Sequence, residues 1–208
     1  MLLSALCTLV ASFSFLSSHP AGTVVQIPLW TWFQVGDFAP GFSLSFDGLA
    51  LTMTGVITGV GFLIHLFAAW YMKGDTGFAR FFSYMNLFVA SMLLLVLADN
   101  LLLLYLGWEG VGICSYLLIG YYYHDRANGR AAMKAFTVTR VGDVFLAFGL
   151  FLLFREFGTL NIQEIITRAP EVFDINNPTM MLTTMMLVGG AMGKSAQLPL
   201  HTWLADAM

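Results

Sequence analysis

Charged residues and cysteines are both scarce in this sequence, and each shortage excludes a class of protein. Charged side chains make up 10% of the 208 residues, against roughly 25% in soluble globular domains. The 12 acidic and 9 basic residues nearly cancel, which leaves no basic stripe for nucleic acid and no acidic tail for cations. With 58% hydrophobic residues, the chain cannot cover a soluble surface. It is predicted to lie in a lipid bilayer.

The two cysteines support neither a disulfide framework nor a metal site. Cys7 and Cys114 lie in apolar runs without a neighbouring His or Cys at metal-ligand spacing. Both are predicted to be small buried hydrophobic residues. No glycine fingerprint follows a predicted strand, and no cysteine set could hold a cluster. The chain itself is therefore expected to bind no flavin, iron–sulfur cluster or nucleotide.

Long apolar runs are abundant, and each approaches the ~20 residues that cross a bilayer as a helix. Residues 1–18 lack the basic n-region of a signal peptide, which favours a membrane helix. The fold class predicted is all-α, a polytopic transmembrane bundle of about six helices, in which Pro199 interrupts the last helix. The predicted spans are 1–18, 48–72, 81–98, 101–123, 134–154 and 179–208.

Loop charges predict the orientation, because cytoplasmic loops carry excess Lys and Arg. Lys73 and Arg80 share one loop, and a second loop contains three basic residues at 126, 130 and 134. On the opposite side, Arg155 and Arg168 are accompanied by several acidic residues, and the segment 19–47 contains no Lys or Arg. The first helix is therefore expected to start in the cytoplasm.

The first outer loop has the character of a β-hairpin. Residues 19–47 are aromatic, alternate in FSLSF and contain a turn-like stretch from Gly36 to Gly41. The alternative is an irregular loop whose Trp30 and Trp32 belong to the interfacial aromatic belt. The expected organisation is a helix at 1–18, a periplasmic hairpin loop at 19–47 and a transmembrane bundle at 48–208. Within that bundle, LNIQEIITRA has helical spacing and is predicted to be a short interfacial helix.

Four strongly ionisable residues lie inside the predicted spans: Glu109, Arg140, Asp143 and Lys194. Intramembrane charges are costly unless they are paired or hydrated, so each suggests a function with a specific partner. Arg140 and Asp143 are three residues apart, within ion-pairing reach on one helical face. With a rise of ~1.5 Å per residue, Asp143 and Lys194 are expected at comparable depths in the membrane. Asp143 is therefore also a candidate partner for Lys194. A static pair that holds helices together is the alternative to a proton relay.

Lys194 lies shortly before Pro199, where the helix is expected to break, and broken membrane helices commonly line water paths. A lysine in such a place can exchange a proton when its carboxylate partner moves. Two histidines are weaker relay candidates: His65, in an otherwise apolar helix, and His201, just past the break. A hydrogen-bonded core residue is the alternative for His65.

Three strings resemble one family closely. LYLGWEGVGICSYLLIG, MKAFTVTRVGD and GKSAQLPLHTWLADAM are similar to the largest antiporter-like subunit of proton-translocating NADH:quinone oxidoreductase (respiratory complex I), subunit L in bacteria. The likeness runs from about Ile27 to the last residue. It implies that Glu109 and Lys194 are the key membrane charges, with Arg140 and Asp143 beside them. Family members have a further helix at the start and many more beyond WLADAM, so the likeness covers only the front part of the first antiporter-like repeat.

The resemblance also implies a location and a setting. The expected location is the bacterial inner membrane, with partners in the other membrane subunits of complex I, the lipid bilayer and protons. FMN, iron–sulfur clusters and quinone are expected in other subunits, so this chain would perform no redox step. The large subunit of a multisubunit sodium/proton antiporter is an alternative, although the continuation VGICSY argues against it. A nonfunctional truncated fragment is the third reading. His201 stands where Gln is expected in many relatives.

Overall fold

The computed structural model describes residues 1–20, 22–36, 38–174 and 177–208. Helices form most of this part of the chain, together with one two-stranded antiparallel sheet. In chain order the elements are α1 (Leu2–Ser18), β1 (Val25–Thr31), β2 (Gly41–Phe46), α2 (Gly48–Tyr71), α3 (Phe78–Val96), α4 (Leu101–Ile119), α5 (Arg126–Phe157), α6 (Ile162–Val172), α7 (Pro178–Lys194) and α8 (Leu204–Ala207). The predicted all-α bundle with a small hairpin is confirmed.

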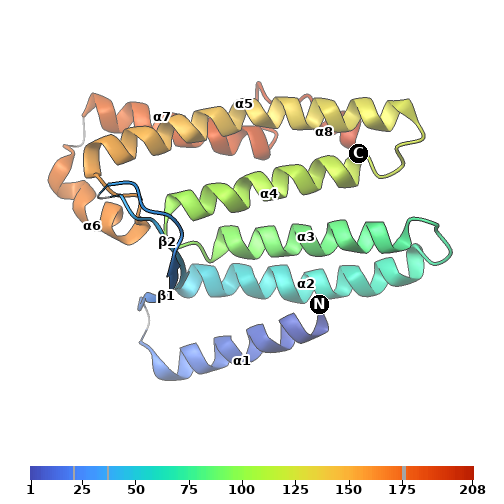
Figure 1. Ribbon diagram of the computed structural model, residues 1–208, viewed down its shortest axis with the longest axis horizontal. Coiled ribbons are helices and arrows are strands. Elements are labelled where there is room, and N and C mark those ends of the chain that lie inside the picture. The colour runs from blue at the N-terminus through green and yellow to red at the C-terminus, as the bar shows by residue number, and fades with distance from the viewer. Residues whose placement is uncertain (21, 37, 175–176) are drawn as a thin grey trace.

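The long helices lie side by side, and their connections gather at two ends (Figure 1). One end, called here the hairpin end, contains β1, β2, the turn between α3 and α4, and α6. The other, called the basic end, contains the α2–α3 and α4–α5 connections and α8. The loops that the charge pattern grouped together therefore share an end of the bundle. This is the arrangement that alternate crossings of a membrane require.

Within the described residues, four helices are long and apolar enough to cross a membrane: α2, α3, α4 and α5. Helices α1 and α7 have 17 residues each, which is the lower limit for a span. The start of α5 differs from the predicted span. The helix begins at Arg126 rather than Lys134, because Asp125 caps it by accepting from Ala127 N–H and an alanine-rich stretch follows. Those residues form helical turns at the basic end, not a loop.

The predicted hairpin is present. β1 and β2 pair in antiparallel register from Val25 opposite Phe46 to Thr31 opposite Gly41, with an irregularity between Pro28 and Trp30. The Trp30 ring stacks on Phe42 at 4.5 Å between centroids. Part of the predicted turn, residue 37, lies outside the described residues. The short helix predicted in LNIQEIITRA is also present as α6, which Asn161 caps by accepting from Glu164 N–H.

Asp99 joins the three parts of the hairpin end. Its buried carboxylate accepts hydrogen bonds from Gln26 on β1, Ser43 on β2 and Asn161 before α6, at 2.7 to 2.9 Å. Its carbonyl accepts from Ile162 N–H. Since a carboxylate can accept about four hydrogen bonds, these donors compensate much of the cost of burying the charge. The turn between α3 and α4 is thereby fixed to the hairpin and to α6.

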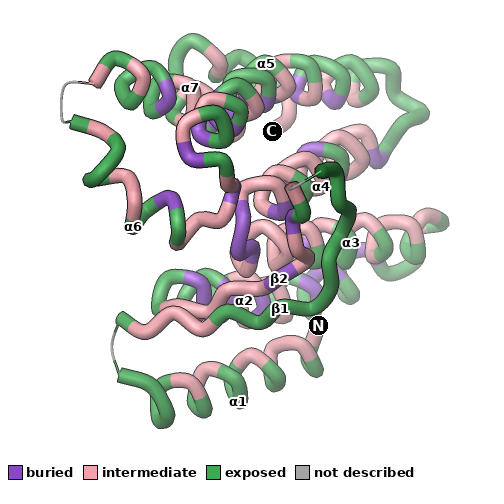
Figure 2. Tube along the Cα trace, turned by 60° about the vertical axis from the view of Figure 1, so that its left-hand side comes forward, coloured by how far each residue is buried: buried purple, intermediate pink, exposed green. Residues whose placement is uncertain are grey.

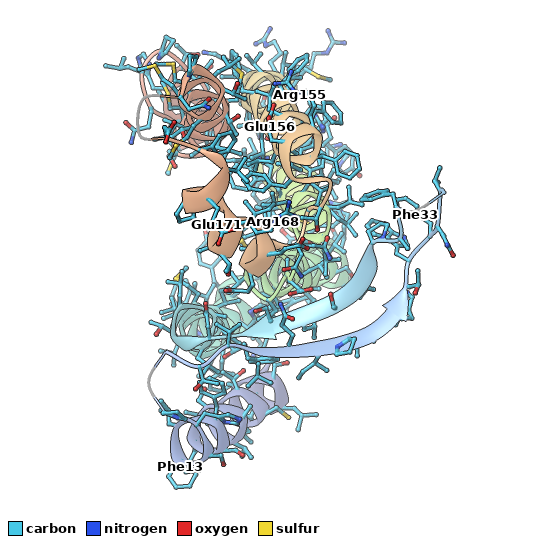
Figure 3. All side chains as sticks on the ribbon, turned by 90° about the vertical axis from the view of Figure 1, so that its left-hand side faces the viewer. Phe13, Phe33, Arg155, Glu156, Arg168 and Glu171 are labelled. Atoms are coloured by element: carbon cyan, nitrogen blue, oxygen red, sulfur yellow. The ribbon has the colours of Figure 1, made fainter. Side chains whose placement is uncertain are left out.

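Both arginines at the hairpin end are paired with glutamates. Figure 3 shows this end with its labelled arginines and glutamates. Arg155 pairs with Glu156 at 2.6 Å, and Arg168 pairs with Glu164 at 2.9 Å. The excess of basic residues is therefore left to the other end, in agreement with the loop count.

At the basic end, Asp75 orders the α2–α3 connection. Its carboxylate accepts from Gly77 N–H at 2.6 Å and from the Tyr121 hydroxyl at 2.9 Å. These two hydrogen bonds, the backbone one foremost, lower the pKa of Asp75 below its usual value. Arg80 lies 5.0 Å from the Tyr121 ring centre, so the start of α3 is also held against the end of α4.

Burial is concentrated where helices meet, and α1 contains no buried residue (Figure 2). The prediction that Cys7 is buried is wrong. This residue is exposed on α1, whereas Cys114 is buried in α4 as expected. The difference arises because α1 contacts the bundle mainly along α2, while α4 lies between α3 and α5.

Glycines allow α5 and α7 to approach closely. A Cβ added to Gly142 on α5 would lie 2.9 Å from the Gly193 Cα on α7, and the reverse substitution meets the same contact. Further along, Gly149 accommodates Leu187 in the same way. Small residues of this kind let backbones meet in a membrane. This contact sets the position along the α5 axis that Lys194 faces.

Candidate functional site

The four predicted intramembrane charges lie where α4, α5 and α7 meet. Glu109 comes from α4, Arg140 and Asp143 from α5, and Lys194 from the last residue of α7. They form a continuous line of ion pairs, with two acids and two bases that sum to zero charge. Such compensation removes most of the penalty that a single charge would carry in hydrocarbon.

Glu109 and Arg140 form the first pair. Arg140 Nη1 donates to Glu109 Oε1, a pairing between two helices that the sequence analysis did not name. The guanidinium also lies 4.8 Å from the Phe136 ring centre, one turn earlier on α5, a cation–π contact that steadies it. Arg140 therefore connects Glu109 to the remaining two charges.

Asp143 is the most deeply buried of the four, with 2% of its side chain exposed. Its Oδ2 lies 3.5 Å from Lys194 Nζ and 3.9 Å from Arg140 Nε. Its Oδ1 accepts a hydrogen bond of 2.6 Å from the Trp108 indole N–H. Both partners that the sequence left open for Asp143 are thus in range of the same oxygen.

Lys194 is placed by the end of α7 and by a glycine on α4. The helix ends at this residue, and turns rather than helix occupy the next residues before α8. The predicted interruption near Pro199 is confirmed, although the regular helix stops five residues earlier. Opposite the lysine is Gly112, where an added Cβ would lie 2.6 Å from Lys194 Nζ. The amine therefore rests directly on the α4 backbone.

A cavity of about 330 Å³ adjoins the lysine. Its polar lining comes from Ser115 and Tyr116 on α4, Thr139 on α5, and Lys194 with Ser195 at the break. A volume of this size with several hydrogen-bonding groups can hold a few water molecules. Waters there would give the Lys194 amine a route for proton exchange other than the Asp143 carboxylate.

The two histidine candidates lie apart from these charges. His65 is buried on α2, its Nδ1 2.7 Å from Gly61 O, and Nε2 has no hydrogen-bond partner among the described residues. Its ring neighbour is Phe82 on α3, at 5.8 Å. His201 is exposed in the turns after α7. Among the described residues that line the Lys194 cavity, neither histidine occurs.

Sequence reasoning missed Trp108 and the individual role of Gly112. Trp108 was part of the quoted GWEG string, but an indole in a membrane helix is normally read as apolar or interfacial. The available signal was spacing. Trp108 and Gly112 are four residues apart and so share one helical face, the face that α5 and α7 cover in the structure.

Comparison with known proteins places the chain among membrane subunits of this type. A family model described as "NADH:quinone oxidoreductase/Mrp antiporter, TM" matches residues 98–208. A second, described as "NADH-Ubiquinone oxidoreductase (complex I), chain 5 N-terminus", matches residues 32–82. Both support the resemblance seen in the three sequence strings.

Individual relatives agree with the family models. NADH-quinone oxidoreductase subunit L of Pseudomonas aeruginosa is 66% identical over 99% of this chain and 34% of its own length. The Escherichia coli subunit L is 68% identical over 87% of this chain and 30% of its own length. This chain therefore spans about a third of the length of the curated relatives it matches. A chain in the structure of the Mrp complex from Dietzia sp. has a TM-score of 0.81 and 26% identity, covering 98% of this chain and 21% of that one.

Proposed function

Because the chain belongs to the NADH:quinone oxidoreductase/Mrp antiporter transmembrane family, we propose that it forms part of the antiporter-like subunit L of a proton-translocating NADH:quinone oxidoreductase. Its contribution is one section of a proton path through the membrane. The observation that carries this function is the line of charges Glu109, Arg140, Asp143 and Lys194, ending beside a mostly apolar cavity that has a few polar groups in its lining.

Lys194 is the proton carrier in this proposal. Its amine lies at the limit of hydrogen-bonding distance from Asp143, 3.5 Å, and also lines the cavity. When Asp143 pairs with it, the protonated form is favoured; when Asp143 pairs more closely with Arg140, the amine can release its proton to cavity water. Glu109 controls that choice, because it competes with Asp143 for Arg140.

His65 and His201 are kept out of the central path. His65 lies on α2 with its ring against Phe82 on α3, away from the four charges. His201 is exposed beyond the break. They are proposed only as relay points towards other parts of the full-length subunit.

The chemistry of the enzyme lies elsewhere. NADH oxidation with FMN and iron–sulfur clusters, and reduction of quinone, are proposed to take place in partner subunits, which drive this chain through conformational or electrostatic coupling. The described residues include no group of three or more His, Cys, Asp or Glu side chains that could hold a metal ion. The proposed neighbours are other membrane subunits of complex I and the lipid bilayer, and the substrate is the proton.

The proposed location is the inner membrane of a bacterium, with the basic end in the cytoplasm and the hairpin end in the periplasm. The Lys and Arg excess at the basic end supports this orientation, as does the pairing of both arginines at the hairpin end with glutamates. The organisation proposed is a first membrane helix at 1–18, a periplasmic hairpin loop at 19–47 and the bundle at 48–208.

A sodium/proton antiporter subunit is the second candidate, favoured by the structural likeness to a chain of the Mrp complex. That chain is 26% identical to this one, whereas two subunits L are 66% and 68% identical. The identity values favour the complex I reading.

Substitution of Lys194 tests the function. In the full-length subunit within assembled complexes, Lys194→Met and Glu109→Gln are expected to lower proton pumping per complex by tenfold or more while complex abundance stays near normal. The matched control is Lys134→Met, because Lys134 forms an exposed pair with Asp206 at 2.7 Å and such pairs contribute only about 0–1 kcal/mol. Pumping is measured in native membrane vesicles and normalised to assembled complex.

The alternative role for Lys194 gives the opposite pattern. If it only holds helices together, its loss strands the buried Asp143 charge at a cost of about 3–5 kcal/mol. Complex abundance would then fall, and the complexes that remain would pump normally. That result would reject the proton-carrier role.

A further inference from the structure

Trp108 contacts both Asp143 and Lys194. Its indole N–H donates to Asp143 Oδ1 at 2.6 Å, and its ring centre lies 5.9 Å from Lys194 Nζ. The ring also lines the cavity beside the lysine. One side chain on α4 thus contacts a carboxylate on α5 and an amine on α7.

The indole determines which Asp143 oxygen faces the cations. Since Oδ1 is occupied by a neutral donor, Oδ2 alone lies between Lys194 Nζ at 3.5 Å and Arg140 Nε at 3.9 Å. Arginine and carboxylate groups otherwise tend to form two parallel hydrogen bonds, which are among the strongest ion pairs in proteins. A bidentate pair needs both carboxylate oxygens turned towards the guanidinium, and the hydrogen bond from the indole keeps Oδ1 turned towards α4.

We propose that Trp108 is a positioning residue that prevents Asp143 from closing a bidentate ion pair with Arg140, and so keeps the carboxylate shared with Lys194. This role rests on the proposed function of Lys194 as a proton carrier. Trp108 itself neither gains nor loses a proton, since the only proton that moves passes between the Lys194 amine and cavity water. Its contribution is to keep the carboxylate able to exchange partners.

The charged and titratable groups around Asp143 define what should change when the indole N–H is removed. Helix α4 supplies Tyr105, which interacts with Glu109 and Asp143. It also supplies Glu109, which acts through Arg140. Helix α5 supplies Arg140 and α7 supplies Lys194. Without the indole donor, Asp143 Oδ1 is free to turn towards Arg140. Lys194 then loses its nearby negative charge, and the carboxylate no longer favours the protonated amine.

The test is the pH profile of proton pumping in assembled complexes that contain the full-length subunit. Trp108→Phe is expected to lower pumping per complex by about tenfold and to move the alkaline limb of the profile to lower pH, because the Lys194 amine loses the negative charge beside it. A tryptophan analogue with sulfur in place of the indole N–H, introduced at position 108, removes the donor and keeps the shape. It should give the same shift even if the smaller Phe ring disturbs assembly.

Trp203→Phe is the matched control. Trp203 lines the same cavity, but its indole N–H donates to the Gly193 carbonyl at 3.1 Å and to no carboxylate. Its loss is expected to leave the position of the alkaline limb unchanged, whatever it does to the amplitude.

Two results are decisive against the inference. If the sulfur analogue pumps normally with an unshifted profile while Lys194→Met does not pump, Trp108 is only a space-filling residue and the proton-carrier role stands. If Lys194→Met also pumps normally per complex, the proposed function fails, and the role of Trp108 fails with it.

Discussion

Gly112 sets the position of Lys194, and Gly112→Ala changes that position with little effect on the fold. The added methyl group would lie 2.6 Å from Lys194 Nζ, about 1 Å closer than an ordinary van der Waals contact. The atom it meets is the end of a flexible side chain, so the lysine moves and the helices do not. Exchanging Gly for Ala in a helix also favours folding by about 1 kcal/mol.

A displacement of about 1 Å matters because the amine serves two neighbours. Lys194 Nζ is already 3.5 Å from Asp143 Oδ2, and misplacement of a reacting group by about 1 Å can lower a rate by as much as 10²-fold. We expect Gly112→Ala to reduce pumping per assembled complex by about tenfold or more. Complex abundance and thermal stability should stay at the level of the unchanged protein.

The matched control is Gly59→Ala on α2, where an added Cβ meets nothing within 4 Å. This substitution brings the same gain in helix propensity without a contact to Lys194. Pumping is measured as acidification of inverted membrane vesicles on addition of NADH, normalised to assembled complex by immunoblot. Full pumping by Gly112→Ala would refute the idea that the position of the Lys194 amine against the α4 backbone controls proton transfer.

Two further predictions concern the hairpin end and the orientation. Asp99→Ala should lower the midpoint of thermal unfolding of the complex, because it strands the buried Ser43 hydroxyl and an unsatisfied buried polar group costs about 1–3 kcal/mol. An unchanged midpoint in a thermal assay would show that this cluster is not structural. Single cysteines near Gly36 should react with an impermeant thiol reagent from outside, whereas those near Asn128 should react only after the cytoplasmic side is opened. Outside labelling at position 128 would reverse the orientation.

The sequence alone determined the membrane class, the hairpin and the identity of the charges. Composition is decisive here, because a chain with 10% charged residues must bury most of its surface in lipid, and every charge within a span then requires a partner. Glu109, Arg140, Asp143 and Lys194 were identified for that reason. Local signals also predicted the hairpin and α6, since alternation and helical spacing act over a few residues.

Pairing within the site was decided by tertiary structure. Spacing showed that Arg140 could reach Asp143, but both Glu109 and Lys194 come from other helices, and no local pattern gives the rotation or height of one helix against another. Those quantities depend on the glycine contact between α5 and α7 at Gly142 and Gly193. The same packing brings the Trp108 indole onto Asp143.

Burial of α1 also lay beyond sequence reasoning. Cys7 was predicted to be buried because its run is apolar, yet it is exposed. In a membrane chain, an apolar side chain can face lipid or protein with similar free energy, since lipid tails are as apolar as a protein interior. Hydrophobicity therefore fixes which segments enter the bilayer, whereas close packing and the pairing of polar groups, which depend on the assembled helices, fix which faces meet.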